Sequence, residues 1–322
     1  MKTYNAAMLS ALKNADNFML CAHINPDGDA IGSMLALGRL LRRMGKTVTM
    51  VLPNPVPNNL AWLPDAALIQ PAEAVQSVPF GAAFCVDVSE PKRMGGAWPI
   101  YERAPLRFVV DHHPGADISY AHHAVIRPEA PAAGELIFAL WEALGLEPDR
   151  EAAAQLYAAI STDTGNFCFD SVRASTFACM EKLMRVGLDL SEASRRLFLV
   201  RSKASALALG RALSSLKFFA GGRATCTHLT ARDKAECQAE DGDLHGMVNQ
   251  GLNIEGVRMT FMADETPEGW KISLRALPGL DVAAIAQQFG GGGHTLAAGC
   301  VLQGSYDTVE QRLMHAIEEA LG

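Results

Sequence analysis

Three short apolar runs constrain the fold of this chain more than any other feature. Each run is long enough for a buried strand, and each ends directly at a side chain able to bind a metal ion or carry a proton. The runs are Phe18–Ala22 before His23, Ala82–Val86 before Asp87, and Leu106–Val110 before Asp111. Helical patterns separate them, which is typical of a parallel sheet covered by helices on both faces. Because ligands bind beyond the carboxyl ends of such strands, we expect these polar residues to lie along one edge.

The character of the sequence changes near residues 200–215. Before this region, further helical patterns follow at 132–144, 150–160 and 173–186. After it, strand patterns predominate, at 216–232, 257–264 and 270–277, and a helix is expected at 281–289. We therefore predict an N-terminal parallel-sheet domain over 1–195, a helical linker over 196–215 and a smaller C-terminal α/β domain over 216–322.

The charge balance limits the classes of partner. The chain has 28 Lys and Arg against 35 Asp and Glu, a net charge of −7. Binding along long nucleic acid relies on neutralising many phosphates, so this balance argues against long DNA or RNA and leaves short phosphorylated ligands open. The 7 cysteines are scattered without a C-x-x-C pair, as expected of reduced thiols. No apolar stretch approaches the ~20 residues of a membrane span, so we expect a cytoplasmic protein without a membrane partner.

Seven or eight metal-competent groups follow the predicted strands. His23, Asp27 and Asp29 lie close together in sequence, and Pro26 and Gly28 between them favour a turn. Beyond them come Asp87, Asp111, His112 and His113, and Asp163 within the segment STDTGNF. Imidazole combined with carboxylates suits Mn²⁺ or Mg²⁺ better than thiolate-seeking metals. Each group alone could be a turn or a helix cap, but together they predict a metal site at one sheet edge.

A second candidate site lies in the C-terminal domain. The run Gly290-Gly-Gly-Gly-His294 could present several backbone N–H groups to an anion, and Arg275 precedes it with a fork suited to phosphate. A tight turn is the structural alternative for such a run. We predict a phosphate clamp formed by Arg275, Gly291, Gly292, Gly293 and His294.

Five motifs in order resemble one family. The segments HINPDGDAIGS, CVDVSE, DHHP and STDTGNF resemble the four motifs of the DHH phosphoesterases. Ile272-Ser-Leu-Arg275 and FGGGGHTLAAGC at 289–300 resemble the DHHA1 substrate-binding domain. The resemblance covers essentially the whole chain. It is strongest to the NrnA-like branch, whose members degrade very short RNA and dephosphorylate 3′-phosphoadenosine-5′-phosphate (pAp).

The resemblance also implies roles for single residues. His23 and Asp27 would bind one divalent cation, Asp29, His112 and Asp163 would bind a second, and Asp87 would bridge them. Asp111 would orient a ligand and His113 would face the substrate. The active site would lie in the cleft between the two domains. Mn²⁺ is the expected ion, with Mg²⁺ as the alternative.

We therefore expect a metal-dependent phosphodiesterase and phosphomonoesterase. Its substrates would be RNAs of about two to five nucleotides, cleaved to mononucleotides, and pAp, converted to AMP. Two alternatives remain open: hydrolysis of linear or cyclic dinucleotide messengers (pApA, pGpG, cyclic di-AMP), and a nucleotide-binding module without catalysis. A homodimer is possible by analogy with the family.

Overall fold

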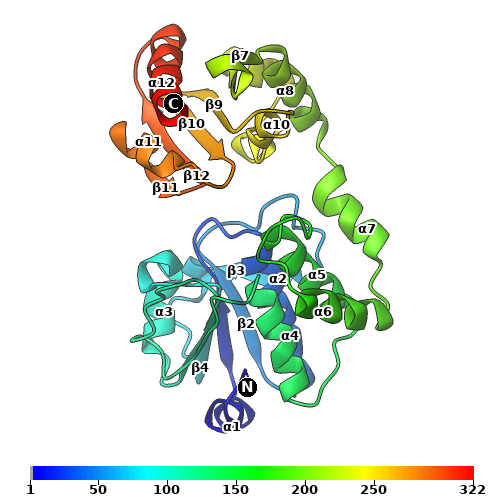
Figure 1. The fold of residues 1–322 in the computed structure, drawn as a ribbon. Helices are drawn as coiled ribbons and strands as arrows, with labels where there is room; N and C mark the ends of the chain where they lie inside the picture. Colours follow the sequence, from blue (N-terminus) through cyan, green and yellow to red (C-terminus); the bar gives the residue numbers. More distant parts are fainter. Residues whose placement is uncertain (1–2) are drawn as a thin grey trace. The chain divides into compact units, whose positions relative to one another are not determined.

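The computed structural model describes residues 3–322 and divides the chain into two compact units, Met1–Val200 and Arg201–Gly322 (Figure 1). Each unit has its own sheet and its own apolar core. Among the residues described, no helix has both the length and the apolar character needed to cross a membrane.

The first unit contains a parallel sheet of six strands, in the order β3-β2-β1-β4-β5-β6. The strands are β1 (Phe18–Cys21), β2 (Val48–Leu52), β3 (Ile69–Pro71), β4 (Ala82–Val86), β5 (Arg107–Asp111) and β6 (His123–Ile126). The strand order reverses between β1 and β4, and this is the place where α/β sheets of this kind bind ligands. The predicted parallel α/β fold is confirmed.

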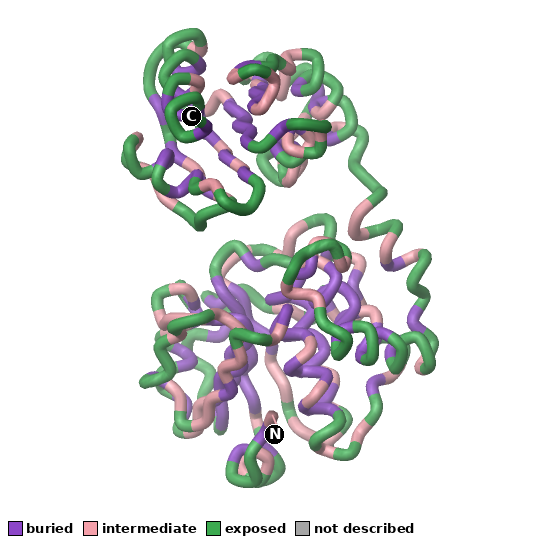
Figure 2. The backbone as a smooth tube through the Cα atoms, in the orientation of Figure 1, coloured by how far each residue is buried: buried purple, intermediate pink, exposed green. Residues whose placement is uncertain are grey.

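Helices cover both faces of this sheet. They are α1 (Ala6–Asn14), α2 (Gly28–Arg43), α3 (Trp98–Arg103), α4 (Ala133–Ala143), α5 (Arg150–Asp163), α6 (Ala174–Arg185) and α7 (Leu190–Ser194). Short 3-10 turns join them at η1 (Ala66–Leu68), η2 (Ala72–Val75) and η3 (Pro91–Ala97). Alternate residues of β1 enter different cores: Leu20 packs with α2, α4 and α5, whereas Met19 and Cys21 pack with α3. The side chains on both faces of the central strands are therefore buried (Figure 2). This explains why the sequences of these strands are apolar without alternation.

Glycines allow α2 to lie very close to α5. A Cβ added to Gly32 would stand 2.3 Å from the Gln155 carbonyl oxygen, and one added to Gly28 would stand 2.3 Å from Thr162 Oγ1. Because Gly28 and Thr162 directly precede Asp29 and Asp163, this close packing brings the two carboxylates to the same place.

The predicted helical linker over 196–215 is interrupted. A π-helical turn, Arg195–Leu199, follows α7, and Val200 is extended before Ser202 caps α8 (Lys203–Ser214). Ala208 and Ala212 of α8 pack into a core cluster of the second unit. The last part of the predicted linker is thus an integral helix of that unit, because its apolar face has a partner there.

The second unit has a six-stranded mixed sheet in the order β11-β12-β10-β9-β8-β7. Its strands are β7 (Lys217–Phe219), β8 (Ala224–Leu229), β9 (Met259–Thr266), β10 (Gly269–Ala276), β11 (Gly292–His294) and β12 (Ala297–Leu302). Its other helices are α9 (Ala231–Cys237), α10 (Asn249–Leu252), α11 (Val282–Gln288) and α12 (Tyr306–Leu321), and η5 (Ala220–Gly222) and η6 (Asp241–Leu244) are 3-10 turns.

The strand expected over 216–232 is wrong in detail. It is two strands, β7 and β8, separated by η5, in which Gly221 has a positive φ of 67°. It also ends early, because the Thr230 side chain caps α9 through the backbone N–H of Asp233.

Two glycine substitutions test the packing of α2 on α5. Gly32→Ala should lower the free energy of unfolding by about 1–3 kcal/mol, because the new methyl group meets backbone atoms of α5. The matched control is Gly210→Ala in α8, where nothing lies within 4 Å of the added Cβ. It should stabilise by about 0.5–1 kcal/mol, as alanine does in an open helix. Urea unfolding followed by circular dichroism measures the free energy of unfolding of both variants. If both substitutions change it in the same direction, close packing at Gly32 does not explain its effect.

Candidate metal centre

The carboxyl ends of three neighbouring strands supply most of the site. His23 lies just beyond β1, Asp87 directly follows β4, and Asp111 is the last residue of β5. Asp87 has a positive φ of 57°, a conformation that non-glycine residues rarely adopt. Strained backbone conformations of this kind persist where the surrounding structure enforces them, and they cluster at functional sites.

The first group of donors consists of His23, Asp27 and Asp87. His23 Nε2 lies 3.3 Å from Asp87 Oδ2 and 3.8 Å from Asp27 Oδ1. His23 Nδ1 lies 2.7 Å from the Ile24 carbonyl, which can only accept, so Nδ1 carries a proton and Nε2 faces the carboxylates. Asp27 is the N-cap of α2, and its Oδ1 accepts from the backbone N–H groups of Asp29 and Ala30.

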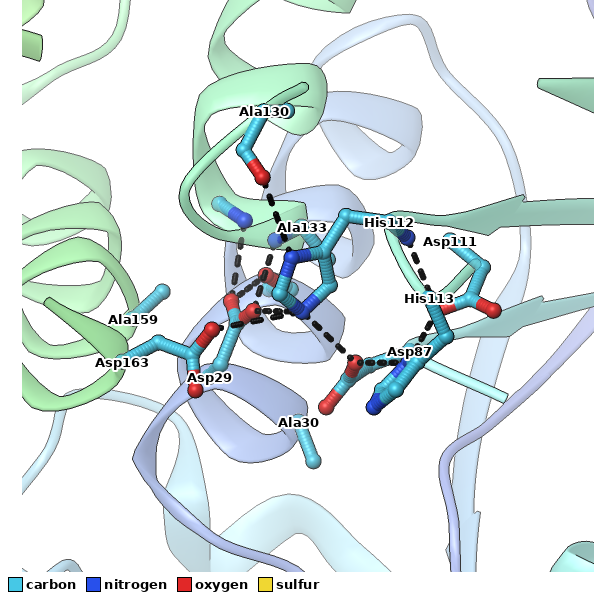
Figure 3. Close-up of polar contacts among 12 residues, drawn as sticks. Asp29, Ala30, Asp87, Asp111, His112, His113, Ala130, Ala133, Ala159 and Asp163 are labelled. Carbon is cyan, nitrogen blue, oxygen red and sulfur yellow. Dashed lines mark hydrogen bonds and ion pairs between the residues drawn. The ribbon is translucent and has the colours of Figure 1, made fainter. Parts of the chain in front are cut away.

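The second group consists of Asp29, His112 and Asp163 (Figure 3). His112 Nε2 lies 3.2 Å from Asp163 Oδ2, 3.7 Å from Asp29 Oδ2 and 3.6 Å from Asp87 Oδ1. The Nδ1 atom of His112 faces the Ala130 carbonyl at 3.1 Å. One oxygen of Asp87 therefore lies near each histidine, a geometry suited to a bridging carboxylate.

The buried carboxylates repel one another. Burial, with the charges of Asp87 and Asp163, raises the pKa of Asp29 well above its ordinary value. Burial also raises the pKa of Asp163 to about 6, with Asp87 and Asp27 adding to the effect and His112 opposing it. Asp87 Oδ1 is buried without a hydrogen-bond partner. Oxygen donors with two imidazoles fit hard divalent cations, and such ions would offset this repulsion.

His113 and Asp111 form a pair beside these groups. His113 Nδ1 lies 2.7 Å from Asp111 Oδ1, which also accepts from the backbone N–H of His112 at 2.8 Å. The hydrogen bond to Asp111 raises the pKa of His113, while burial and the positive charge of Arg93 oppose the rise. With Nδ1 held by Asp111, the Nε2 atom of His113 is the one available to a ligand.

Several contributors were missed from the sequence. Asp29 accepts hydrogen bonds from Ser33 Oγ at 2.9 Å and from the backbone N–H groups of Ala133 and Gly134 at 2.6 and 2.9 Å. The amides belong to the first turn of α4, where a helix favours a negative charge. Ser33 follows Asp29 by one helical turn and could have been found by that spacing. The contact with α4 is tertiary and had no local signal.

The predicted clamp residues lie on three adjacent strands of the second unit. Arg275 of β10 pairs with Ala297 of β12, and Ala297 pairs with His294 of β11. Arg275 and His294 therefore lie in one row across the sheet. Burial lowers the pKa of Arg275, and no acidic group of the described residues counters this.

The glycine run has a packing role as well. A Cβ on Gly293 would stand 2.6 Å from the Ala297 carbonyl oxygen, and one on Gly291 would stand 2.2 Å from that of Gly299. These two glycines let β11 approach β12 closely. Gly292 has open space around it, so it alone of the three could accept a side chain without a clash.

Comparison with known proteins matches a different domain family to each of the two units. Residues 17–160 match the DHH family, N-terminal domain, and residues 228–322 match the DHHA1 domain. The bifunctional oligoribonuclease and PAP phosphatase NrnA of Thermus thermophilus is 32% identical over 94% of this chain and 89% of its own length. The cyclic-di-AMP phosphodiesterase PdeA of Listeria monocytogenes is 24% identical over 98% of this chain but only 50% of its own length. The structure of an exopolyphosphatase-related protein from Bacteroides fragilis matches 97% of this chain and 95% of its own, with a TM-score of 0.91 and 27% identity.

Metal binding should release protons. Burial opposes a charge on His23, but hydrogen bonds to Asp27 and Asp87 outweigh it and raise the pKa of the imidazole to about 10. At pH 7 the metal-free imidazole is therefore protonated, and a cation at Nε2 must displace that proton. We expect apparent Mn²⁺ affinity to fall about tenfold per proton for each unit of pH decrease. Calorimetric titration in buffers of different ionisation enthalpy measures the release.

The control for this titration is His315→Gln, an exposed histidine of α12 paired with Glu319. It should leave the release unchanged, whereas His23→Gln should reduce it by about one proton. Equal release by the two variants would contradict the assignment of the proton to His23.

Proposed function

Because the chain belongs to the DHH family of phosphoesterases and carries a DHHA1 domain, we propose that it hydrolyses short RNA oligonucleotides and pAp with the help of two divalent cations. The observation that carries the proposal is the Asp87 carboxylate, whose two oxygens face His23 and His112. His23 belongs to one group of three possible donors, with Asp27 and Asp87, and His112 to another, with Asp29 and Asp163. A third group joins Asp87 and His112 with His113. The name of the Thermus relative, at 32% identity, supports the choice of substrates.

The six side chains divide into two sets in this proposal. His23 and Asp27 would hold one cation and Asp29, His112 and Asp163 the other. Asp87 would contribute to both, because its two oxygens face His23 and His112. When bound, such a pair of ions supplies an activated water molecule and neutralises charge on the phosphate oxygens. The donor set suits Mn²⁺ and Mg²⁺, and we propose Mn²⁺ because two of the donors are imidazoles.

His113 handles the proton in this mechanism. Asp111 holds Nδ1 and raises the pKa of His113, which favours the charged imidazole in which Nε2 also carries a proton. That proton can be donated to the leaving oxygen as the phosphorus–oxygen bond breaks, which is general acid catalysis. The same charged ring attracts the phosphate before the reaction. Asp111 positions His113 and needs no contact with substrate.

The DHHA1 unit provides a second grip in this proposal. Arg275 has no acidic partner among the described residues and lies in one row with His294, so the two can bind a phosphate together. A grip on one phosphate while another is cleaved would favour substrates of a few nucleotides. The alternative is a linear or cyclic dinucleotide messenger, a class supported by the name of the Listeria relative.

A substrate series tests the proposal. With Mn²⁺, the protein should release AMP from pAp and mononucleotides from di- to pentanucleotides, with kcat/KM falling at least about tenfold towards ~20 nucleotides. pApA, pGpG and cyclic di-AMP belong in the same series. If a cyclic dinucleotide is hydrolysed faster than pAp and short RNA, the messenger alternative replaces this proposal.

Replacing the Asp87 carboxylate with a carboxamide should distinguish an enzyme from a nucleotide-binding module. Asp87→Asn keeps the size of the side chain but removes the charge between the two histidines, so kcat for pAp should fall at least about 100-fold. The matched control is Asp264→Asn, a buried carboxylate of β9 paired with Lys234. It should keep activity within about threefold. Full activity of Asp87→Asn would favour a binding module and remove two-metal catalysis from this site.

A further inference from the structure

Phe169 is an exposed aromatic residue close in sequence to the metal centre. It lies in the loop between α5, which ends at Asp163, and α6. Its exposed fraction is 58%, whereas Phe18, Phe84 and Phe108 of the same unit are fully buried. An isolated exposed aromatic residue is common on a protein surface, so its exposure alone indicates nothing.

The backbone of the loop returns Phe169 to the end of α5. Gly165, Asn166 and Phe167 have consecutive positive φ values of 56°, 55° and 64°, which reverse the chain. The N–H groups of Cys168 and Phe169 then both donate to the Thr164 carbonyl, at 3.0 and 3.1 Å. Phe169 is thus tied to the residue that directly follows Asp163. Two non-glycine residues in the left-handed region cost about 1–3 kcal/mol each, and such strain gathers at ligand-binding sites.

The Phe169 ring is also fixed against the backbone. A Cβ added to Gly165 would stand 2.4 Å from Phe169 Cε1, so the ring lies directly against the glycine. The neighbouring Phe167 behaves differently, because its ring packs with Tyr157 and Phe177 at centroid distances of 6.3 and 5.7 Å. Phe169 is absent from every aromatic pair found among the described residues. Its ring is therefore positioned by the loop and still open to solvent.

We propose that Phe169 is the surface on which a nucleobase of the substrate stacks while the adjoining phosphate lies at the metal centre. The inference rests on the proposed function, since only a nucleotide brings a base beside the phosphate. Stacking on an aromatic side chain contributes about 1–3 kcal/mol per base and tolerates any base, because every base has a π-face. Phe169 is then a specificity residue for nucleotides over other phosphoesters, without preference for one sequence.

Substrates with and without a base test this role. Phe169→Ala should raise KM for pAp by about 5- to 150-fold, the equivalent of one lost stacking contact, with kcat within about twofold. Ribose 3,5-bisphosphate, which lacks the base, should be hydrolysed equally by the variant and the original protein. Phe169→Trp should restore a low KM for pAp. An unchanged KM in Phe169→Ala, or an equal loss for both substrates, would overturn the inference.

Phe177→Ala is the matched control, because Phe177 has a similar exposed fraction of 56% but lies on α6 and contacts Phe167. It should leave KM for pAp unchanged. Calorimetric titration with AMP and with ribose 5-phosphate tests the stacking role separately from the proposed hydrolysis, because binding needs no turnover. If the original protein binds AMP more tightly and Phe169→Ala removes the difference, stacking holds even where hydrolysis of pAp fails. If Phe169→Ala instead changes only the oligomeric state, the ring is a protein contact and the inference is wrong.

Discussion

Four carboxylates, Asp27, Asp29, Asp87 and Asp163, lie together at one edge of the first sheet, and their mutual repulsion is the constraint on which this unit depends. Helix N-termini reduce it: Asp27 caps α2, and Asp29 accepts two amides from the first turn of α4. Glycine contacts between α2 and α5 then fix the distance between Asp29 and Asp163. The remaining repulsion is what bound cations would offset.

The parallel sheet and its edge were predictable because they depend on local signals. A strand buried on both faces is uniformly apolar, so a polar residue directly after it marks the strand end, as Asp87 does after β4. Parallel pairing then places successive ends on one edge without further information. The amides of α4 that hold Asp29 could not be predicted, because their partner is more than 100 residues away and no periodicity links them.

The second unit was harder to predict for a different reason. Its glycines allow more than one interpretation: 216–232 is predicted as one strand, whereas Gly221 and Gly222 lie in the turn η5 that divides it. Likewise, the run Gly290–His294 suggested an open anion loop, but Gly291 and Gly293 are needed where β11 lies against β12. The same residues can satisfy packing and binding at once, because the outer edge of β11 has no neighbouring strand in this sheet.

In the proposed function, the site would divide recognition among groups that contact different parts of a nucleotide. The carboxylates and histidines would act on the phosphate, and neither Asp87 nor His113 offers a hydrogen-bonding pattern that distinguishes one base from another. A stacked ring at Phe169 would add affinity for any base, because it forms no hydrogen bonds to base edges. Length selection would then rest on further phosphates, for which Arg275 and His294 of the second unit are the proposed binding groups. An acidic chain can work this way, because local cations and a few basic groups set the field that the substrate meets.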